Sequence, residues 1–525
     1  MNSRWFQQWF VLLAILSPLR SEAQAASAGP AEAAELRWFF LGLEALKQTN
    51  IGTTFRDIIA LPESRELKAR MWDRVAPAFA QRFIAKSGPE TANPAELLRP
   101  FFTNWLEAPS YFEIHRSPTG ATEWLAAIRL TPNSGRAQDS LARLVDGWRY
   151  RSTTTTNQLA LISTNSWLGL VALSGSPGAA ADGLARFPSA RPILERHRPA
   201  ELASDQFFRL EGNPGLLVPR LWPSGTNAPA LTLTLQGRGD ALRTEGRLRF
   251  PHPVNWNLEA WRIPTNSIGD PNGSLMSFTV VRGFRAWAAE TPWVKALSLR
   301  EIPNQLFAWQ DAHALFQVFS AIPIPGAAGW LREATNAPLA PLQKRLASGG
   351  PGGLEFRAED SRLMWAGLPW IVPYLLPVRE GPTEYMLGGL FPLNEPKGDR
   401  APDPLLQQLI SRTNLLYYDW ELTEVRLAQL RPLGQLLSLL FTWPQIEPDG
   451  PIFRWLEAAS PKLGNTVTEV AVISPREVGF LRNSHVGVSA IELLVLAHWM
   501  QMEQFPAVPS SIGLRTAPPS PATPP

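Results

Sequence analysis

The amino-acid sequence predicts an α+β protein, in which a helical N-terminal segment is followed by antiparallel sheets packed on helices. Short apolar strands come in pairs separated by turn residues, which is typical of antiparallel hairpins. Too few strands alternate with helices for a doubly wound or TIM-type fold. Apolar residues make up 45% of the 525 residues and charged residues 18%, which is the composition of a globular protein.

Residues 1–25 have the pattern of an export signal. Arg4 provides a positive charge, residues 5–16 are mostly apolar, and Ala23 and Ala25 place small side chains where a signal peptidase cleaves. The apolar stretch is shorter than the roughly 20 residues that span a bilayer. We therefore expect cleavage after Ala25, an exported protein in the periplasm or the medium, and no membrane span after removal of the signal.

The charge and the cysteine content exclude several classes of function. Removal of residues 1–25 takes away Arg4, Arg20 and Glu22, which changes the formal net charge from +3 to +2. This near-neutral charge, without a basic run, argues against a nucleic-acid partner. The sequence has no cysteine, which excludes thiol catalysis, disulfide exchange and cysteine-ligated metals. We expect no cofactor.

The segment 26–107 is predicted to be helical. Leu36, Phe39, Phe40 and Leu43 follow helical spacing, and a second amphipathic stretch runs over residues 63–86, where Pro77 kinks or divides the helix. Asn93 followed by Pro94 is typical of a helix start, with asparagine as the cap and proline at the first helical position.

Residues 108–200 form the first predicted α+β domain, in which two strands, a helix and two further strands follow one another. These elements are Tyr111–Arg116, Trp124–Leu130, Ser140–Arg149, Gln158–Ser163 and Trp167–Leu173.

Residues 201–400 form a β-rich central region, in which Gly237–Asp240 is predicted to be the turn of a hairpin. The expected strands are Phe207–Gly212, Ala230–Gln236, Ala241–Phe250, Ser274–Gly283, Ala314–Ile322, Gly353–Arg357, Arg362–Ala366 and Glu384–Leu387, with a helix over Gly329–Ala347.

Residues 401–504 form a second predicted α+β domain, and residues 505–525 form a Pro-rich tail expected to be disordered. The order of elements after residue 414 echoes the first domain, so a degenerate internal duplication and a chance likeness both stay open. The expected strands are Leu415–Glu421, Thr466–Ser474 and Val478–Arg482, and the expected helices are Leu427–Phe441, Phe453–Ser460 and Ile491–Met500.

No familiar catalytic or metal-binding motif is present, and the six histidines are scattered. The best local pair of carboxylates is Asp419 and Glu421, which lie on one face of a strand because Trp420 separates them. The pair either flanks a scissile bond in a hydrolase or forms a solvated strand face. We expect it to point to solvent or to a cleft, because Tyr418 and Trp420 make the other face the buried one.

Arg282 and the tryptophans are further candidates. Arg282 follows an apolar strand, where an arginine either pairs with a buried carboxylate or binds an acidic ligand. Trp261 belongs to a cluster that either packs in the core or forms a platform for a sugar or a lipid. The cluster comprises Trp256, Trp261, Trp287, Trp293 and Trp309.

Several phrases of the chain resemble those in a family of exported proteins of Verrucomicrobia-type bacteria. The resemblance covers most of the chain and implies lineage and export, but no activity. The phrases are Trp261-Arg-Ile-Pro-Thr-Asn266, Ser277-Phe-Thr-Val-Val-Arg-Gly-Phe284, Gly388-Gly-Leu-Phe-Pro392, Tyr417-Tyr-Asp-Trp-Glu421 and Asn465-Thr-Val-Thr-Glu469.

Two functions are consistent with these observations. The favoured one is an exported envelope protein with a non-catalytic binding or structural role, whose partner is another envelope protein or an apolar or sugar ligand. The alternative is an extracytoplasmic hydrolase that uses dispersed carboxylates.

Overall fold

The computed structural model describes residues 36–506 with gaps. The gaps are 50–51, 117–121, 132–134, 152–155, 165, 175–182, 197–204, 214–228, 269–274, 292–293, 296, 312–317, 335–338, 340–351, 368–371, 391–402, 431, 433–449 and 503–504. The predicted signal, its cleavage site at Ala25 and the tail beyond residue 506 lie outside the described residues.

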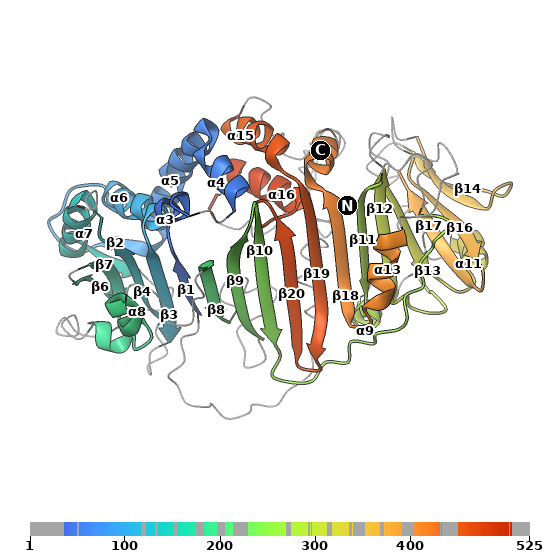
Figure 1. The fold of residues 1–525 in the computed structure, drawn as a ribbon, viewed down its shortest axis with the longest axis horizontal. Helices are drawn as coiled ribbons and strands as arrows, with labels where there is room; N and C mark the ends of the chain where they lie inside the picture. Colours follow the sequence, from blue (N-terminus) through green and yellow to red (C-terminus); the bar gives the residue numbers. More distant parts are fainter. Residues whose placement is uncertain are drawn as a thin grey trace, which may run out of the picture.

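The described strands form a sheet of 20 strands, and neighbouring strands are antiparallel throughout (Figure 1). From one edge to the centre the order is β14 (Gly353–Arg357), β15 (Arg362–Ala366), β16 (Tyr374–Glu380), β17 (Thr383–Gly389), β13 (Val318–Pro323), β12 (Gln305–Asp311), β11 (Leu275–Arg282), β18 (Leu415–Leu422), β19 (Asn465–Ser474) and β20 (Glu477–Ser484). From there to the other edge it is β10 (Ala241–Arg249), β9 (Ala230–Arg238), β8 (Gln206–Gly212), β1 (Leu36–Phe40), β3 (Ser110–Arg116), β4 (Thr122–Arg129), β7 (Trp167–Leu173), β6 (Thr156–Ser163), β5 (Trp148–Arg151) and β2 (Ile84–Lys86).

Most of the larger helices lie on one face of the sheet, which we call the helix-covered face. At one end of this face, apolar side chains of β4 and β7 pack against α5 (Pro62–Phe83), α6 (Pro94–Glu107) and α7 (Gly135–Gly147). At its middle, α3 (Leu43–Lys47), α4 (Thr53–Ala60), α15 (Pro451–Ala459), η4 (Ser460–Lys462) and α16 (Ala490–Gln501) form the cover.

The other face, which we call the opposite face, is covered mainly towards its two ends. Towards one end, η2 (Gly183–Arg186) and α8 (Ala190–Arg196) pack on β1, β3, β4 and β7. Towards the other end, α13 (Asp403–Ser411) packs on β11, β12, β13 and β18. Two short helices, α9 (Arg285–Glu290) and α11 (Ala327–Ala334), lie in the same half of the molecule as α13 (Figure 1).

The α+β class and the local hairpins are confirmed. Each of the pairs β3–β4, β6–β7, β9–β10 and β19–β20 joins strands that the sequence predicts as neighbours. Asn93 caps α6 as expected, because its side chain accepts a hydrogen bond from the backbone N–H of Ala95. The helix α5 runs without interruption through Pro77, so this proline does not divide it.

Two expectations about local structure are wrong, and two strands were missed. Residues 36–40 form a strand and not a helix, because they pair with β3 on one side and β8 on the other. The strands β12 and β16 were not expected. The helix predicted over 329–347 is confirmed over 329–334, within α11, and most of 335–347 lies outside the described residues. The predicted disordered tail begins with a packed residue, since the Phe505 side chain is buried and lies under the guanidinium of Arg74.

One sheet runs through all the predicted domain segments. The strand β1, from the predicted helical segment, lies between a strand of the first α+β domain and a strand of the central region. The two blocks of the suspected duplication contribute different strand orders, β3–β4–β7–β6 and β18–β19–β20, and the duplication stays unconfirmed. Within the described chain, no helix has the length and apolar character needed to span a membrane.

Candidate functional site

Asp419 and Glu421 lie at the centre of the sheet, on its helix-covered face. Both side chains are buried, with exposed fractions of 3% and 0%. The expectation that they point to solvent or a cleft is therefore wrong. The strand β18 lies between β11 and β19 and is covered on both faces, so burial of Tyr418 on one face does not leave the other face open.

Polar side chains from neighbouring strands form two rows across the sheet at this point. The antiparallel register places Gln310, Ser277, Glu421 and Thr466 in one row. It places Thr279, Asp419, Thr468 and Arg482 in the second row. Because directly opposed residues share a face of the sheet, these side chains project together towards the helices.

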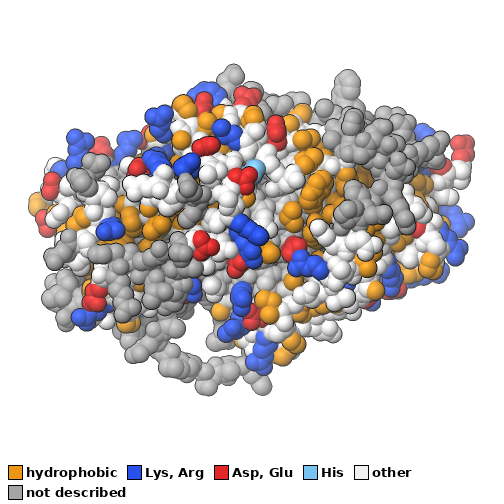
Figure 2. Space-filling view, viewed as in Figure 1, with side chains coloured by type: hydrophobic (Ala, Val, Ile, Leu, Met, Phe, Trp, Pro, Cys, Tyr) orange, Lys and Arg blue, Asp and Glu red, His pale blue; other side chains and the backbone are white. Residues whose placement is uncertain are grey.

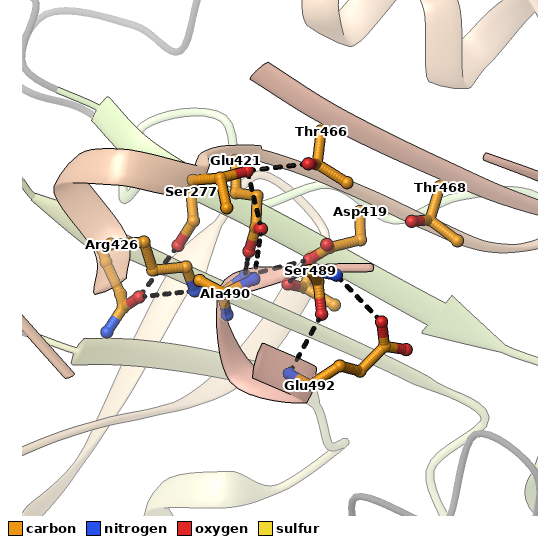
Figure 3. A network of polar contacts seen from close by, with 12 residues as sticks. Ser277, Asp419, Glu421, Arg426, Thr466, Thr468, Ser489, Ala490 and Glu492 are labelled. Carbon is orange, nitrogen blue, oxygen red and sulfur yellow. Dashed lines mark hydrogen bonds and ion pairs between the residues drawn. The ribbon is translucent and has the colours of Figure 1, made fainter. Parts of the chain in front are cut away.

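Arg426 lies over the first row, on the helix-covered face of the sheet, and contacts Gln310 and Glu421. It belongs to the helical residues 423–430, which directly follow β18. Its Nη1 atom lies 2.6 Å from Oε2 of Glu421 and 3.5 Å from Oδ1 of Asp419. Its Nε donates to Oε1 of Gln310 at 3.0 Å. One buried guanidinium therefore joins both carboxylates to the strand β12 (Figure 3).

Both carboxylates accept further hydrogen bonds. Oε1 of Glu421 accepts from the backbone N–H of Ala490 at 2.7 Å and from the Thr423 hydroxyl at 3.0 Å. Oδ1 of Asp419 accepts from the Thr279 hydroxyl at 2.5 Å. Ala490 is the first residue of α16, so Glu421 fastens the start of this helix to the sheet.

The second row fastens α16 through Arg482. This arginine forms a bidentate ion pair with Glu492, at 2.6 and 3.0 Å, and donates to the Thr468 hydroxyl at 2.9 Å. Glu492 also forms a capping box with Ser489, in which each side chain bonds the backbone N–H of the other residue. The same carboxylate thus caps the helix, as Figure 3 shows, and through Arg482 it holds the helix on β20.

We call these residues the central network: Ser277, Thr279, Gln310, Asp419, Glu421, Thr423, Arg426, Thr466, Thr468, Arg482, Ser489, Ala490 and Glu492. Burial raises the pKa of Glu421, and the neighbouring Asp419 charge adds to this increase against the opposing effect of Arg426. Burial alone would lower the pKa of Arg426, but the two carboxylates outweigh it and raise that pKa. Two cavities of the described surface, of about 510 and 20 Å³, are lined by other residues.

Among the described residues Arg282 does not pair with a buried carboxylate, so that expectation is wrong, and the binding of an acidic ligand stays a prediction. Its guanidinium donates to three backbone carbonyl oxygens, those of Glu259, Thr413 and Leu415. It also lies 4.1 Å from the centre of the Trp261 ring. Burial lowers the pKa of Arg282 to about 10. Arg282 therefore ties two loop segments to the end of β11.

The tryptophan cluster does not form a platform among the described residues. Trp256 and Trp309 are buried, with exposed fractions of 6% and 2%. Trp261 is partly buried between Arg282 and Phe307, whose ring centre lies 6.2 Å away. Trp293 lies outside the described residues. These contacts make Trp261 a packing residue of the core around β11 and β12.

A second buried carboxylate group was not expected from the sequence. Glu113 on β3 accepts from the Tyr111 hydroxyl at 2.7 Å, and burial raises the pKa of Glu113. Glu123 on β4 contacts His115 at 3.2 Å and Arg186 at 2.6 Å. Burial alone would raise the pKa of Glu123, but hydrogen bonds from His115 and from Ser174, with the charge of Arg186, lower it to about 2.

Sequence reasoning also missed Arg426 and Arg482. Arg426 lies between Val425 and Leu427, and Arg482 lies between Leu481 and Asn483, which gives little sign of a buried charge. The available signal was the run of hydroxyl side chains at alternate positions of β19, Thr466 and Thr468. Hydroxyls at core positions of a central strand indicate that a polar group lies against them.

Comparison with models of protein families, with curated proteins and with solved structures finds no match. In the part of the chain that the structure describes, no group of three or more His, Cys, Asp or Glu side chains is arranged to hold a metal ion. The chemistry of the site therefore has to be inferred from its own contacts.

Proposed function

We propose that this protein is exported and that its role is non-catalytic, either binding a partner or serving as a structural component of the cell envelope. The proposal rests mainly on the burial and the hydrogen-bond partners of the Asp419–Glu421–Arg426 group. A catalytic carboxylate must reach the substrate. These carboxylates are instead buried and occupied by Arg426, Thr279, Thr423 and the N–H of Ala490.

The alternative, a hydrolase with dispersed carboxylates, draws no support from these contacts. The pKa of Glu421 is raised and the pKa of Glu123 is lowered, as in an acid and a base, but buried ion pairs produce the same shifts. Glu123 is also held by His115, Ser174 and Arg186 and has an exposed fraction of 1%.

Export is supported by the pattern of residues 1–25. Mass spectrometry of the protein from its native host tests this part of the proposal. The expected N-terminal residue is Ala26, and a protein that retains Met1 would contradict export by cleavage.

The non-catalytic role is tested with the purified full-length mature chain. It is incubated with neutral polysaccharides, acidic polysaccharides and a denatured protein, and new reducing ends and new amino groups are measured over time. We expect no increase above a heat-inactivated sample. Hydrolysis that disappears in Asp419→Asn, while that variant keeps its circular dichroism spectrum, would contradict the proposal.

A further inference from the structure

We propose that the centre of the opposite face, which none of the described helices covers, binds an acidic polysaccharide, a sugar polymer that carries carboxylates. This inference deepens the proposed non-catalytic role and rests on it. The surface consists of side chains from the neighbouring strands β9, β10 and β20, between the parts of the sheet covered by α8 and α13.

Alternation along β10 places a column of charged side chains on this face. Arg243, Glu245, Arg247 and Arg249 occupy every second position, whereas the residues between them are buried on the helix-covered face. The exposed fractions of the side chains rise along the strand from 30% at Arg243 to 67% at Arg247 and 73% at Arg249. At about 3.3 Å per residue the column is about 20 Å long.

The arginines at the lower end of this column outnumber their anionic partners. Arg247 and Arg249 share one carboxylate, that of Glu477, at 3.4 and 3.7 Å. Each guanidinium has five N–H donors, so a single shared carboxylate leaves most of them directed to solvent. Figure 2 shows Lys and Arg side chains, with Asp and Glu side chains between them, at the centre and lower centre of this face.

A surface depression adjoins these arginines and adds a third one. It has a volume of about 510 Å³ and lies where the hairpin of β19 and β20 meets the end of β10. Its lining residues are Ala230, Arg249, Phe250, Pro251, Ser474, Arg476 and Glu477. The depression therefore offers Arg249 and Arg476 beside an apolar floor, which suits a carboxylate attached to a larger body.

The neutral polar side chains beside the column favour a sugar polymer as the occupant. In the sheet register, Gln236 and Asn483 flank Arg243, and Thr232 flanks Arg247. Amide and hydroxyl groups donate to and accept from sugar hydroxyls, and the guanidinium fork matches a carboxylate. A nucleic acid fits less well, because Glu245 and Glu477 interrupt the positive column.

Affinity electrophoresis of the full chain at low salt tests this proposal, with polygalacturonate in the gel and dextran as the neutral comparison. We expect polygalacturonate to retard the protein and dextran to leave its mobility unchanged. The double variant Arg247→Gln, Arg249→Gln should bind about tenfold more weakly. The matched control is Arg143→Gln, which changes an arginine of α7 that is 56% exposed and also paired with a glutamate. It should bind within about twofold of the unchanged chain.

Three outcomes would overturn the proposal: no retardation by polygalacturonate, equal retardation by dextran, or unchanged binding by the double variant. Stronger retardation by poly-glutamate than by polygalacturonate would also overturn it, because the occupant would then be an acidic peptide. Shortening of polygalacturonate during incubation is a separate result. It would contradict the non-catalytic role, whereas loss of retardation in the double variant would still support this surface as the binding site.

Discussion

The guanidinium of Arg426 and the carboxylate of Glu421 lie 2.6 Å apart with almost no contact with solvent, the residues being 5% and 0% exposed. Two charges removed from water are costly, and their attraction offsets this cost only when further hydrogen bonds complete the arrangement. Here Gln310, Thr423 and Ala490 provide those bonds. The pair therefore depends on the sheet and on α16 being in place, and the position of α16 depends on the pair.

Glu421→Gln should lower the free energy of unfolding by about 2 kcal/mol, because the new amide turns its NH₂ group towards Arg426 or towards the N–H of Ala490. The deficit should be largest near pH 4 and shrink towards pH 7. Since the pKa of Glu421 is raised, its contribution to stability is full below the unfolded value of about 4.5 and declines as the pH rises. Urea unfolding followed by tryptophan fluorescence measures the free energy of unfolding of both chains at each pH. A deficit of the variant that grows with pH would contradict this prediction.

Ser489→Ala and Glu492→Gln separate the two roles of Glu492. The serine variant loses the helix cap and should lose about 1 kcal/mol. The glutamine variant keeps a capping oxygen but loses the charge opposite Arg482, and solvent screening of its half-exposed side chain limits that loss to about 1 kcal/mol. Hydrogen exchange of residues 490–501 is the measurement, with 94–107 as the internal control. If the backbone amides of residues 490–501 exchange equally fast in both variants and in the unchanged chain, Glu492 and Ser489 do not stabilise α16.

Arg282→Lys should not be a conservative change. An ammonium group does not reproduce the planar fork that reaches the carbonyl oxygens of Thr413 and Leu415, nor its contact with the Trp261 ring. We expect a loss of about 2 kcal/mol from carbonyl groups left without a donor. Trp261→Phe, which keeps an aromatic face, should change stability by less than about 1 kcal/mol. Denaturant unfolding measures the free energy of unfolding of both variants. Equal losses of stability in the two variants would be inconsistent with this account of Arg282.

Glu123→Gln should remove part of the acid sensitivity of the protein. The pKa of Glu123 is lowered to about 2, so its stabilising contribution is present above the unfolded value of about 4.5 and is lost as the pH falls towards 2. The variant should be less stable than the unchanged chain at pH 7, by on the order of 3 kcal/mol, and the two stability curves should converge near pH 2. Parallel curves between pH 7 and pH 2 would refute this assignment.

Local patterns in the sequence predict the parts of the fold that depend on neighbouring residues. The hairpin of β3 and β4 and the cap at Asn93 are such cases, because the turn or cap lies within a few residues of what it organises. The strand over residues 36–40 is different. Its partners, β3 and β8, are distant in sequence, and this pairing overrides the helical spacing of its apolar residues.

At the candidate site, too, the sequence predicts what depends on neighbouring residues and not what depends on distant ones. Strand alternation correctly places Asp419 and Glu421 on one face, since both meet Arg426. Alternation does not reveal that both faces of β18 are covered, because the covers come from α13 and α16 and not from the strand itself. Arg282 was placed correctly at the end of a strand, but two of its carbonyl partners, Glu259 and Thr413, lie in loops without a sequence signature, and the third, Leu415, is the first residue of β18.

The central claim is that the Asp419–Glu421–Arg426 group is structural, and the free energy of unfolding of Arg426→Met at several pH values tests it most directly. Removal of the guanidinium leaves two buried carboxylates without a counter-charge, so we expect a loss of about 3–5 kcal/mol at pH 7. The loss should be smaller at pH 4, because burial raises the pKa of Glu421 and this carboxylate takes up a proton more readily in the folded chain. Arg454→Met, which changes a 48% exposed arginine paired with Glu66, should lose less than about 1 kcal/mol. A folded Arg426→Met variant with a loss below about 0.5 kcal/mol, independent of pH, would contradict the claim.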